Sequence, residues 1–184
     1  MSAYLVLLLA VLSRVLPHAF HATGVNFTAV GAGLLFFGSR RSRWHALAAM
    51  AVMALTDVYL TVFAYNYPFH LCADLVTWAW YAAVCLIGHG LLSHRRSMLR
   101  VGAAVLASST SFFVLSNLAV WAGGGMYAHT AAGLGACYVA AIPFFANDLM
   151  STTLTASVLF GLPVLARMIV SSLREARGND LRLG

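Results

Sequence analysis

The sequence predicts an all-α membrane protein with six transmembrane helices, on the basis of its composition, its length and the spacing of its arginines. Of the 184 residues, 61% are hydrophobic and 9% are charged. A soluble domain has about 45–50% apolar and about 25% charged residues, so this composition excludes water-soluble enzymes, nucleic-acid-binding proteins and disordered chains. A span needs about 20 residues, which leaves room for about six spans with short loops.

Six apolar runs separated by breaks are the predicted spans: 3–16, 27–37, 45–63, 73–92, 99–121 and 149–173. We interpret the first run as a retained helix and not as a signal peptide, because no Lys or Arg precedes it. Pro17 is expected to end it, since proline removes a helical hydrogen bond. The first two runs are short for a hydrocarbon core of about 30 Å, and short membrane helices are tolerated where they line a cavity. The break at 17–26 is therefore a candidate binding region.

The segment 130–145 is also apolar, but a glycine run (123–125) precedes it and Asn147 and Asp148 follow it. We expect a surface helix here, between spans five and six, because a seventh crossing would disrupt the pattern of charges.

That pattern places arginines after every second span, at positions 40, 41, 43, 95, 96, 100, 174, 177 and 182, whereas the other loops contain no Arg or Lys. Basic loops face the cytoplasm. The sequence thus predicts a multi-pass membrane protein with both termini cytoplasmic. Residues 1–173 form one polytopic domain, and residues 174–184 form a cytoplasmic tail.

Asp57 lies inside the third predicted span, about six residues from its outer end. An ionisable group there costs about 2.5–3.5 kcal/mol on insertion scales, so it should face a cavity or a partner. Either the carboxylate bonds to a neighbouring helix, for example to Asn117 or the Ser108–Ser111 cluster, or it faces a substrate.

The predicted outer loops collect polar and metal-ligating residues: His18, His21, His70, Cys72, Asp74, His129 and Asp148. Aromatic residues surround them, including Tyr67, Trp78, Trp80, Tyr81 and Trp121. An interfacial belt explains most of these aromatics. However, an apolar pocket with a few polar groups is also the usual form of a small-molecule site.

The stretch 70–74 is the most chemically specific. Asp74 is expected to cap the fourth span, which would place Cys72 just before a helix N-terminus that favours its thiolate. Thiolate and imidazole both bind late transition metals. The alternative is that Cys72 is an inert interfacial residue, as we expect for Cys85 and Cys137. Phosphate-binding loops, HExxH and GxSxG are absent from the sequence.

Five stretches carry a resemblance to known transporters: 14–18 (R-V-L-P-H), 26–28, 56–57, 111–121 (S-F-F-V-L-S-N-L-A-V-W) and 133–149. On these stretches the chain resembles the BtuM-type vitamin B12 transporters. Those are solitary relatives of the substrate-binding S components of energy-coupling-factor transporters.

The resemblance implies an S-component-like bundle in the bacterial inner membrane that holds cobalamin in an outward-facing cavity, with no cofactor of its own. No nucleic-acid partner is expected from the composition, and the sequence leaves open whether an energising module is required. The resemblance also implies that a cysteine after span three ligates cobalt and promotes loss of cyanide. Cys72, the candidate catalytic residue, lies in the matching loop, and His70 is the alternative cobalt ligand. The candidate substrate-binding residues are His18, Asp57, Tyr67, Asp74, Tyr81 and Asn117.

The predicted function is therefore uptake of cobalamin or a related corrinoid across the inner membrane. Two alternatives remain: a membrane-bound enzyme that removes cyanide from cyanocobalamin, and a transporter of another vitamin or of a transition-metal ion. The metal ion would bind through His18, His21, His70 and His129.

Overall fold

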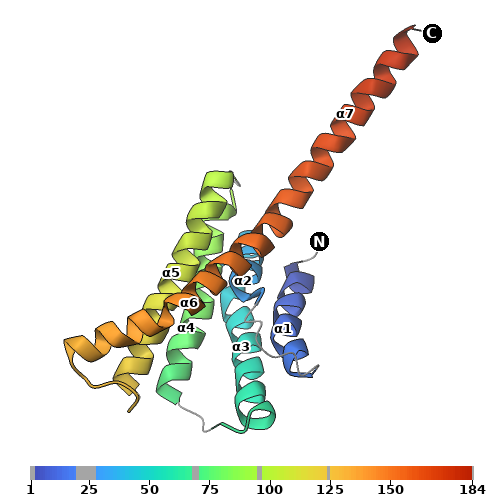
Figure 1. The fold of residues 1–184 in the computed structure, drawn as a ribbon. Helices are drawn as coiled ribbons and strands as arrows, with labels where there is room; N and C mark the ends of the chain where they lie inside the picture. The colour runs from blue at the N-terminus through green and yellow to red at the C-terminus, as the bar shows by residue number, and fades with distance from the viewer. Residues whose placement is uncertain (1–2, 20–27, 68–70, 95–96, 124, 184) are drawn as a thin grey trace.

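The computed structural model describes residues 3–19, 28–67, 71–94, 97–123 and 125–183, and these form helices and short connections without a strand (Figure 1). The helices are α1 (Ala3–Ala19), α2 (Val30–Arg40), α3 (His45–Val58), α4 (Leu71–Leu92), α5 (Met98–Gly123), α6 (Ala131–Ala156) and α7 (Leu162–Leu183). Two π-helical segments extend them: η1 (Tyr59–Ala64) after α3, and η2 (Ser157–Gly161) between α6 and α7. The predicted all-α class is confirmed.

The short helix α2 forms the centre of the bundle. Every residue from Val30 to Ser39 is buried, against α1, α4, α5 and α6. Its 11 residues reach only about 16 Å, so α2 is shorter than the hydrocarbon core. Glycines allow its closest contacts, because a Cβ on Gly38 would collide with the Cys85 backbone of α4, and a Cβ on Gly88 would collide with Leu35.

Four helical segments are long and apolar enough to cross a membrane: His45–Ala64, Asp74–Leu92, Met98–Gly123 and Ala131–Ser172. The apolar part of α1, Ala3–Leu16, is shorter. Large apolar side chains face outward, for example Leu55, Phe63 and Leu99, which are 71%, 72% and 84% exposed. Such a surface is unfavourable in water and natural in lipid, which supports a helical membrane protein.

Two predicted boundaries are wrong. The expected surface helix at 130–145 and the sixth span at 149–173 belong to one continuous rod, in which α6, η2 and α7 follow one another without a loop (Figure 1). The predicted break at Asn147 and Asp148 does not occur, because Asp148 faces the interior of the bundle, where it lines a cavity with α2 and α5. In α1, the helix continues through Pro17 to Ala19. Proline removes one hydrogen bond, but the last turn persists.

The helix ends that flank the first two predicted arginine clusters share one end of the bundle. The end of α2, the start of α3, the end of α4 and the start of α5 all lie at the end from which α7 projects (Figure 1). We call this the arginine end and define it by residues 40–43 and 97–100. The C-terminal end of α1, the end of η1 and the start of α4 lie at the opposite end.

Candidate functional site

Asp57, in the last turn of α3, is 6% exposed and is bound by three side chains from two other helices. Arg14 of α1 forms an ion pair with Oδ1 of Asp57. The hydroxyl of Tyr81 in α4 donates to the same oxygen at 3.3 Å, and Nε1 of Trp78 donates to Oδ2 at 3.1 Å. Arg14 also donates to the Tyr81 hydroxyl at 3.0 Å, so the four residues form one network across α1, α3 and α4.

The network satisfies a charge that would otherwise be isolated among apolar side chains. A buried carboxylate needs a cation and hydrogen-bond donors, and Arg14, Tyr81 and Trp78 supply both. The partners proposed from the sequence were wrong. Ser111 instead accepts from Nε1 of Trp80 at 3.0 Å, and the Asn117 amide donates to the Phe113 carbonyl at 2.8 Å.

A cavity of about 260 Å³ lies beside this network, among α1, α2, α4, α5 and α6. Arg14 and Tyr81 form one part of its wall and Asp148 forms another. The remaining lining residues are Thr28, Val30, Trp80, Phe112 and Phe144. Because Asp57 binds both Arg14 and Tyr81, it positions two of the polar groups that reach the cavity.

A smaller cavity of about 140 Å³ adjoins the first one between α5 and α6. The two share Phe112, Phe144 and Asp148, and Asn117 lines the smaller cavity. Asp148 forms no ion pair with any side chain that the structure describes, whereas Arg14 is already paired with Asp57. Ser109 of α5 lies within hydrogen-bonding reach of this carboxylate, but no described cation neutralises its charge, so it can pair with a cation on a ligand.

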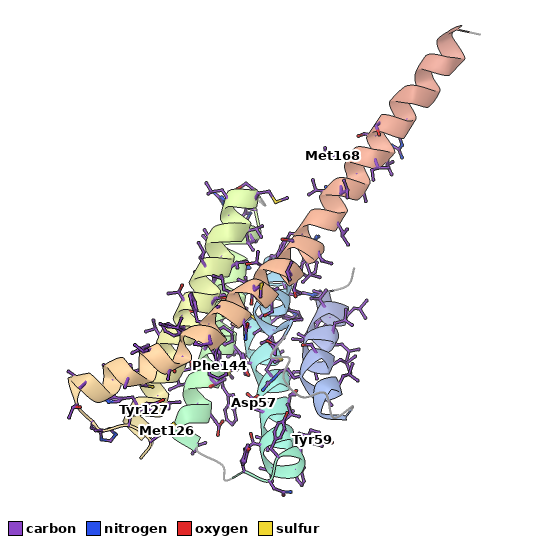
Figure 2. The ribbon with its side chains drawn as sticks, viewed as in Figure 1. Asp57, Tyr59, Met126, Tyr127, Phe144 and Met168 are labelled. Carbon is purple, nitrogen blue, oxygen red and sulfur yellow. The ribbon has the colours of Figure 1, made fainter. Side chains whose placement is uncertain are left out.

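Aromatic rings form most of the apolar wall. The rings of Trp80 and Phe112 lie 4.6 Å apart between centroids, and those of Phe113 and Phe145 lie 5.0 Å apart. Figure 2 marks Phe144 on α6 and Asp57 on α3. An apolar, aromatic cavity with two donors and one carboxylate is suited to binding an organic molecule in a defined orientation.

The structure brings together some of the predicted site residues. Asp57 and Tyr81 belong to the network, and Asn117 lines the adjoining cavity. Tyr67, in contrast, is 68% exposed and stacks on Tyr65 with 6.0 Å between ring centroids, outside both cavities.

The stretch after η1 differs from the prediction. Helix α4 begins at Leu71, so Cys72 and Asp74 lie within its first turn, and Asp74 is not the N-cap residue. Cys72 does not precede the helix either, and its side chain is outside the described part of the structure. Along α4, Cys72 is nine residues from Tyr81, or about 13 Å.

The other predicted metal ligands are only partly described. His18 lies in the last turn of α1, with a side chain that is not described, and His21 and His70 are outside the described residues, as is most of the break at 17–26. The ring of His129 packs edge-on against Trp121. Among the described residues, no group of three His, Cys, Asp or Glu side chains could hold a metal ion. Cys85 and Cys137 are buried free thiols.

The sequence did not predict Arg14 as the partner of Asp57, although Arg14, like Asp57, is a charged residue within an apolar run. It also missed Phe112 and Phe144 as cavity residues, because apolar aromatic residues in a span look the same whether they face lipid or a cavity. For Trp78 and Trp80 the sequence left an interfacial belt and a pocket as alternatives, and the structure shows that their indole nitrogens donate to Asp57 and Ser111.

Comparison with known proteins gives one result. The model of a family described as "Family of unknown function (DUF6580)" matches residues 1–173, and the chain therefore belongs to this family. No curated protein and no solved structure matches the chain.

Proposed function

We propose that this member of the DUF6580 family is a membrane transport protein that binds an organic solute in the cavity beside the Arg14–Asp57 pair. The observation that carries the proposal is the convergence of Arg14, Tyr81 and Asp148 on an aromatic cavity of about 260 Å³ within an apolar bundle. Ionisable residues inside a membrane typically mark substrate pathways, and ligand cavities are mostly apolar with a few oriented polar groups.

The proposed direction of transport is inward across the bacterial inner membrane, with the arginine end and both termini in the cytoplasm. Arg14 is five residues, or about 7 Å, from the end of α1 opposite to the arginine end. Thr28, which also lines the cavity, lies two residues before the start of α2, at the same end of the bundle as the C-terminal end of α1. A solute from outside would thus reach the cavity by a short path.

The proposed substrate is a corrinoid, on the basis of the resemblance described above. Its cobalt would be ligated by Cys72, in the first turn of α4, or by His70. A ligand that touches both Cys72 and Tyr81 must extend about 13 Å along α4, which favours a large molecule over a small one. Drug-sized ligands occupy cavities of about 300–1,000 Å³, so a corrinoid would require the helices around this cavity to separate.

The visible spectrum of cobalamin tests this substrate. We expect protein purified with cyanocobalamin to retain the corrinoid with an altered, base-off spectrum. Cys72→Ala should change that spectrum, and Cys85→Ala, a buried cysteine in the same helix, should not. If His70 is the ligand instead, His70→Ala will change it. An unaltered spectrum with no retained corrinoid would exclude a corrinoid substrate.

The same preparation separates transport from the alternative activities. Multiple turnover of cyanocobalamin with an added reductant would favour a decyanating enzyme, whereas stoichiometric conversion favours a binding site. A larger thermal shift with nickel, cobalt or zinc ions than with cobalamin would favour a metal transporter.

Native mass spectrometry tests the cavity without assuming the substrate. Protein extracted from membranes should carry a small-molecule adduct that Asp148→Leu reduces. Met150→Leu, an exposed position in the same helix that lines neither cavity, should leave the adduct unchanged. Equal adducts in the wild type and in Asp148→Leu would contradict a role of this cavity.

A further inference from the structure

A separate cavity of about 370 Å³ lies at the arginine end. Its polar wall consists of Arg40, the last residue of α2, Arg167 of α7, and Ser93 and His94, which follow α4. The buried Oγ of Ser93 has no hydrogen-bond partner in the described part of the chain. Three chain segments that are distant in sequence therefore bring two guanidinium groups, an imidazole and an unsatisfied hydroxyl to one place.

The positive charge of this cavity is not compensated. Neither Arg40 nor Arg167 forms an ion pair with a described side chain. The chain has five acidic residues, and the one that follows Arg167 most closely, Glu175, is eight residues further along α7, or about 12 Å. The carbonyl ends of α2 and α4 contribute partial negative charges of about half a unit, which two full positive charges exceed. The cavity thus attracts an anion.

An apolar groove of about 410 Å³ adjoins the basic cavity, and Phe160 of η2 lines both. The groove runs between the start of α5 and the η2 region, along Met98, Val105 and Gly161. Nothing lies within 4 Å of the position that a Cβ on Gly161 would occupy, so this part of the groove is open. A basic cavity joined to an apolar groove matches a molecule with an anionic head and a hydrocarbon chain.

We propose that the arginine end binds an anionic phospholipid, with its phosphate between Arg40 and Arg167 and an acyl chain in the groove along α5. Arginine guanidiniums bind phosphate oxygens through paired hydrogen bonds, and basic pockets at the cytoplasmic side of membrane helices bind anionic headgroups. The site shares no residue with the cavity beside Arg14. It therefore stands independently of the proposed transport function.

Lipid titration of the delipidated protein, followed by native mass spectrometry, tests this site. We expect tighter binding of phosphatidylglycerol than of phosphatidylcholine with the same acyl chains. Arg40→Gln with Arg167→Gln should weaken phosphatidylglycerol binding by about fivefold for each arginine. The control is Arg43→Gln with Arg174→Gln, which removes the same charge from two exposed arginines outside the cavity. Equal losses in the two double variants would show a diffuse charge effect and overturn the site.

Two further arms distinguish a lipid from free phosphate. Gly161→Leu places a side chain in the groove and should weaken phosphatidylglycerol binding while both arginines remain. Inorganic phosphate at millimolar concentration should not displace the lipid. Displacement by inorganic phosphate together with no effect of Gly161→Leu would show that the cavity takes free phosphate, and would overturn the lipid proposal.

Discussion

At the scale of single residues, one buried carboxylate organises the candidate site. Asp57 has a cation and two neutral donors around it, and two of these partners, Arg14 and Tyr81, also reach the cavity. Removal of one member of a buried ion pair leaves an uncompensated charge, which costs more than the pair itself contributes. The network therefore links the stability of the bundle to the shape of the cavity.

Arg14→Gln should lower the free energy of unfolding by about 3–5 kcal/mol, because it leaves the Asp57 carboxylate buried without a cation. The double variant Arg14→Gln with Asp57→Asn should lose less free energy of unfolding than the sum of the losses in the two single variants. Denaturant titration in detergent micelles measures both effects. Arg43→Gln is the control, because Arg43 is exposed and lies over the Trp44 ring at 5.6 Å. Wild-type stability in Arg14→Gln would contradict the importance of the pair.

Tyr81→Phe keeps the ring and removes the hydroxyl that joins Arg14 to Asp57. We expect a loss of about 1 kcal/mol in the free energy of unfolding, since one typical hydrogen bond contributes about that amount. The Asp57 carboxylate retains Arg14 and Trp78, so this loss should be clearly smaller than that of Arg14→Gln in the same titration. A loss as large as that of Arg14→Gln would mean that the hydroxyl, and not the cation, holds the carboxylate.

At the scale of helices, close backbone contact holds α2 at the centre. Apolar side chains gain little by leaving lipid for another helix, so membrane helices associate through small residues that let backbones approach. Gly38 and Gly88 are such residues at the α2–α4 contact. Gly33 of α2 has the same role against α1, because a Cβ on Gly33 would lie only 2.9 Å from the Cβ of Ala10.

Gly88→Ala should destabilise the protein by about 1–3 kcal/mol, because the added methyl group meets the Leu35 backbone and α2 must move away from α4. Gly90→Ala is a matched control two residues further along α4, where nothing lies within 4 Å of the added Cβ. It should be neutral or stabilise the helix by up to about 1 kcal/mol, from helix propensity alone. Thermal unfolding of both variants in the same detergent checks the difference, and equal midpoints would contradict the close contact.

At the scale of the whole molecule, a lipid environment explains why so little of each span is buried. Between 17% and 33% of the residues in the four spanning windows are buried inside the structure, and the others are partly or largely exposed. The arginine end then meets the charged headgroups, while the candidate cavity lies towards the opposite end.

Labelling of single cysteines with a membrane-impermeant maleimide checks this arrangement. In a background in which Cys72, Cys85 and Cys137 are replaced by alanine, Ser42→Cys and Ser97→Cys should react from the same side of the membrane. Met126→Cys, in the exposed connection between α5 and α6, should react from the other side. Reaction of Ser42→Cys and Ser97→Cys from opposite sides would contradict a shared arginine end.

The sequence was sufficient for those features that depend on local composition. Hydrophobic runs predicted the helical membrane class and the helices around 45–63, 73–92 and 99–121, because hydropathy and length alone determine whether a segment partitions into lipid. The insertion cost of a charge likewise indicated that Asp57 needs a cavity or a partner.

Only the tertiary structure decided which partner Asp57 has and where a cavity forms, since both depend on the helix faces that meet. Arg14 and Asp57 are 43 residues apart along the chain, and no periodicity in either run indicates that they touch. The same reason explains the continuous rod from Ala131 to Leu183. A polar pair such as Asn147 and Asp148 ends a helix or lines a cavity according to what the neighbouring helices present to it, and those neighbours, α2 and α5, come from distant parts of the chain.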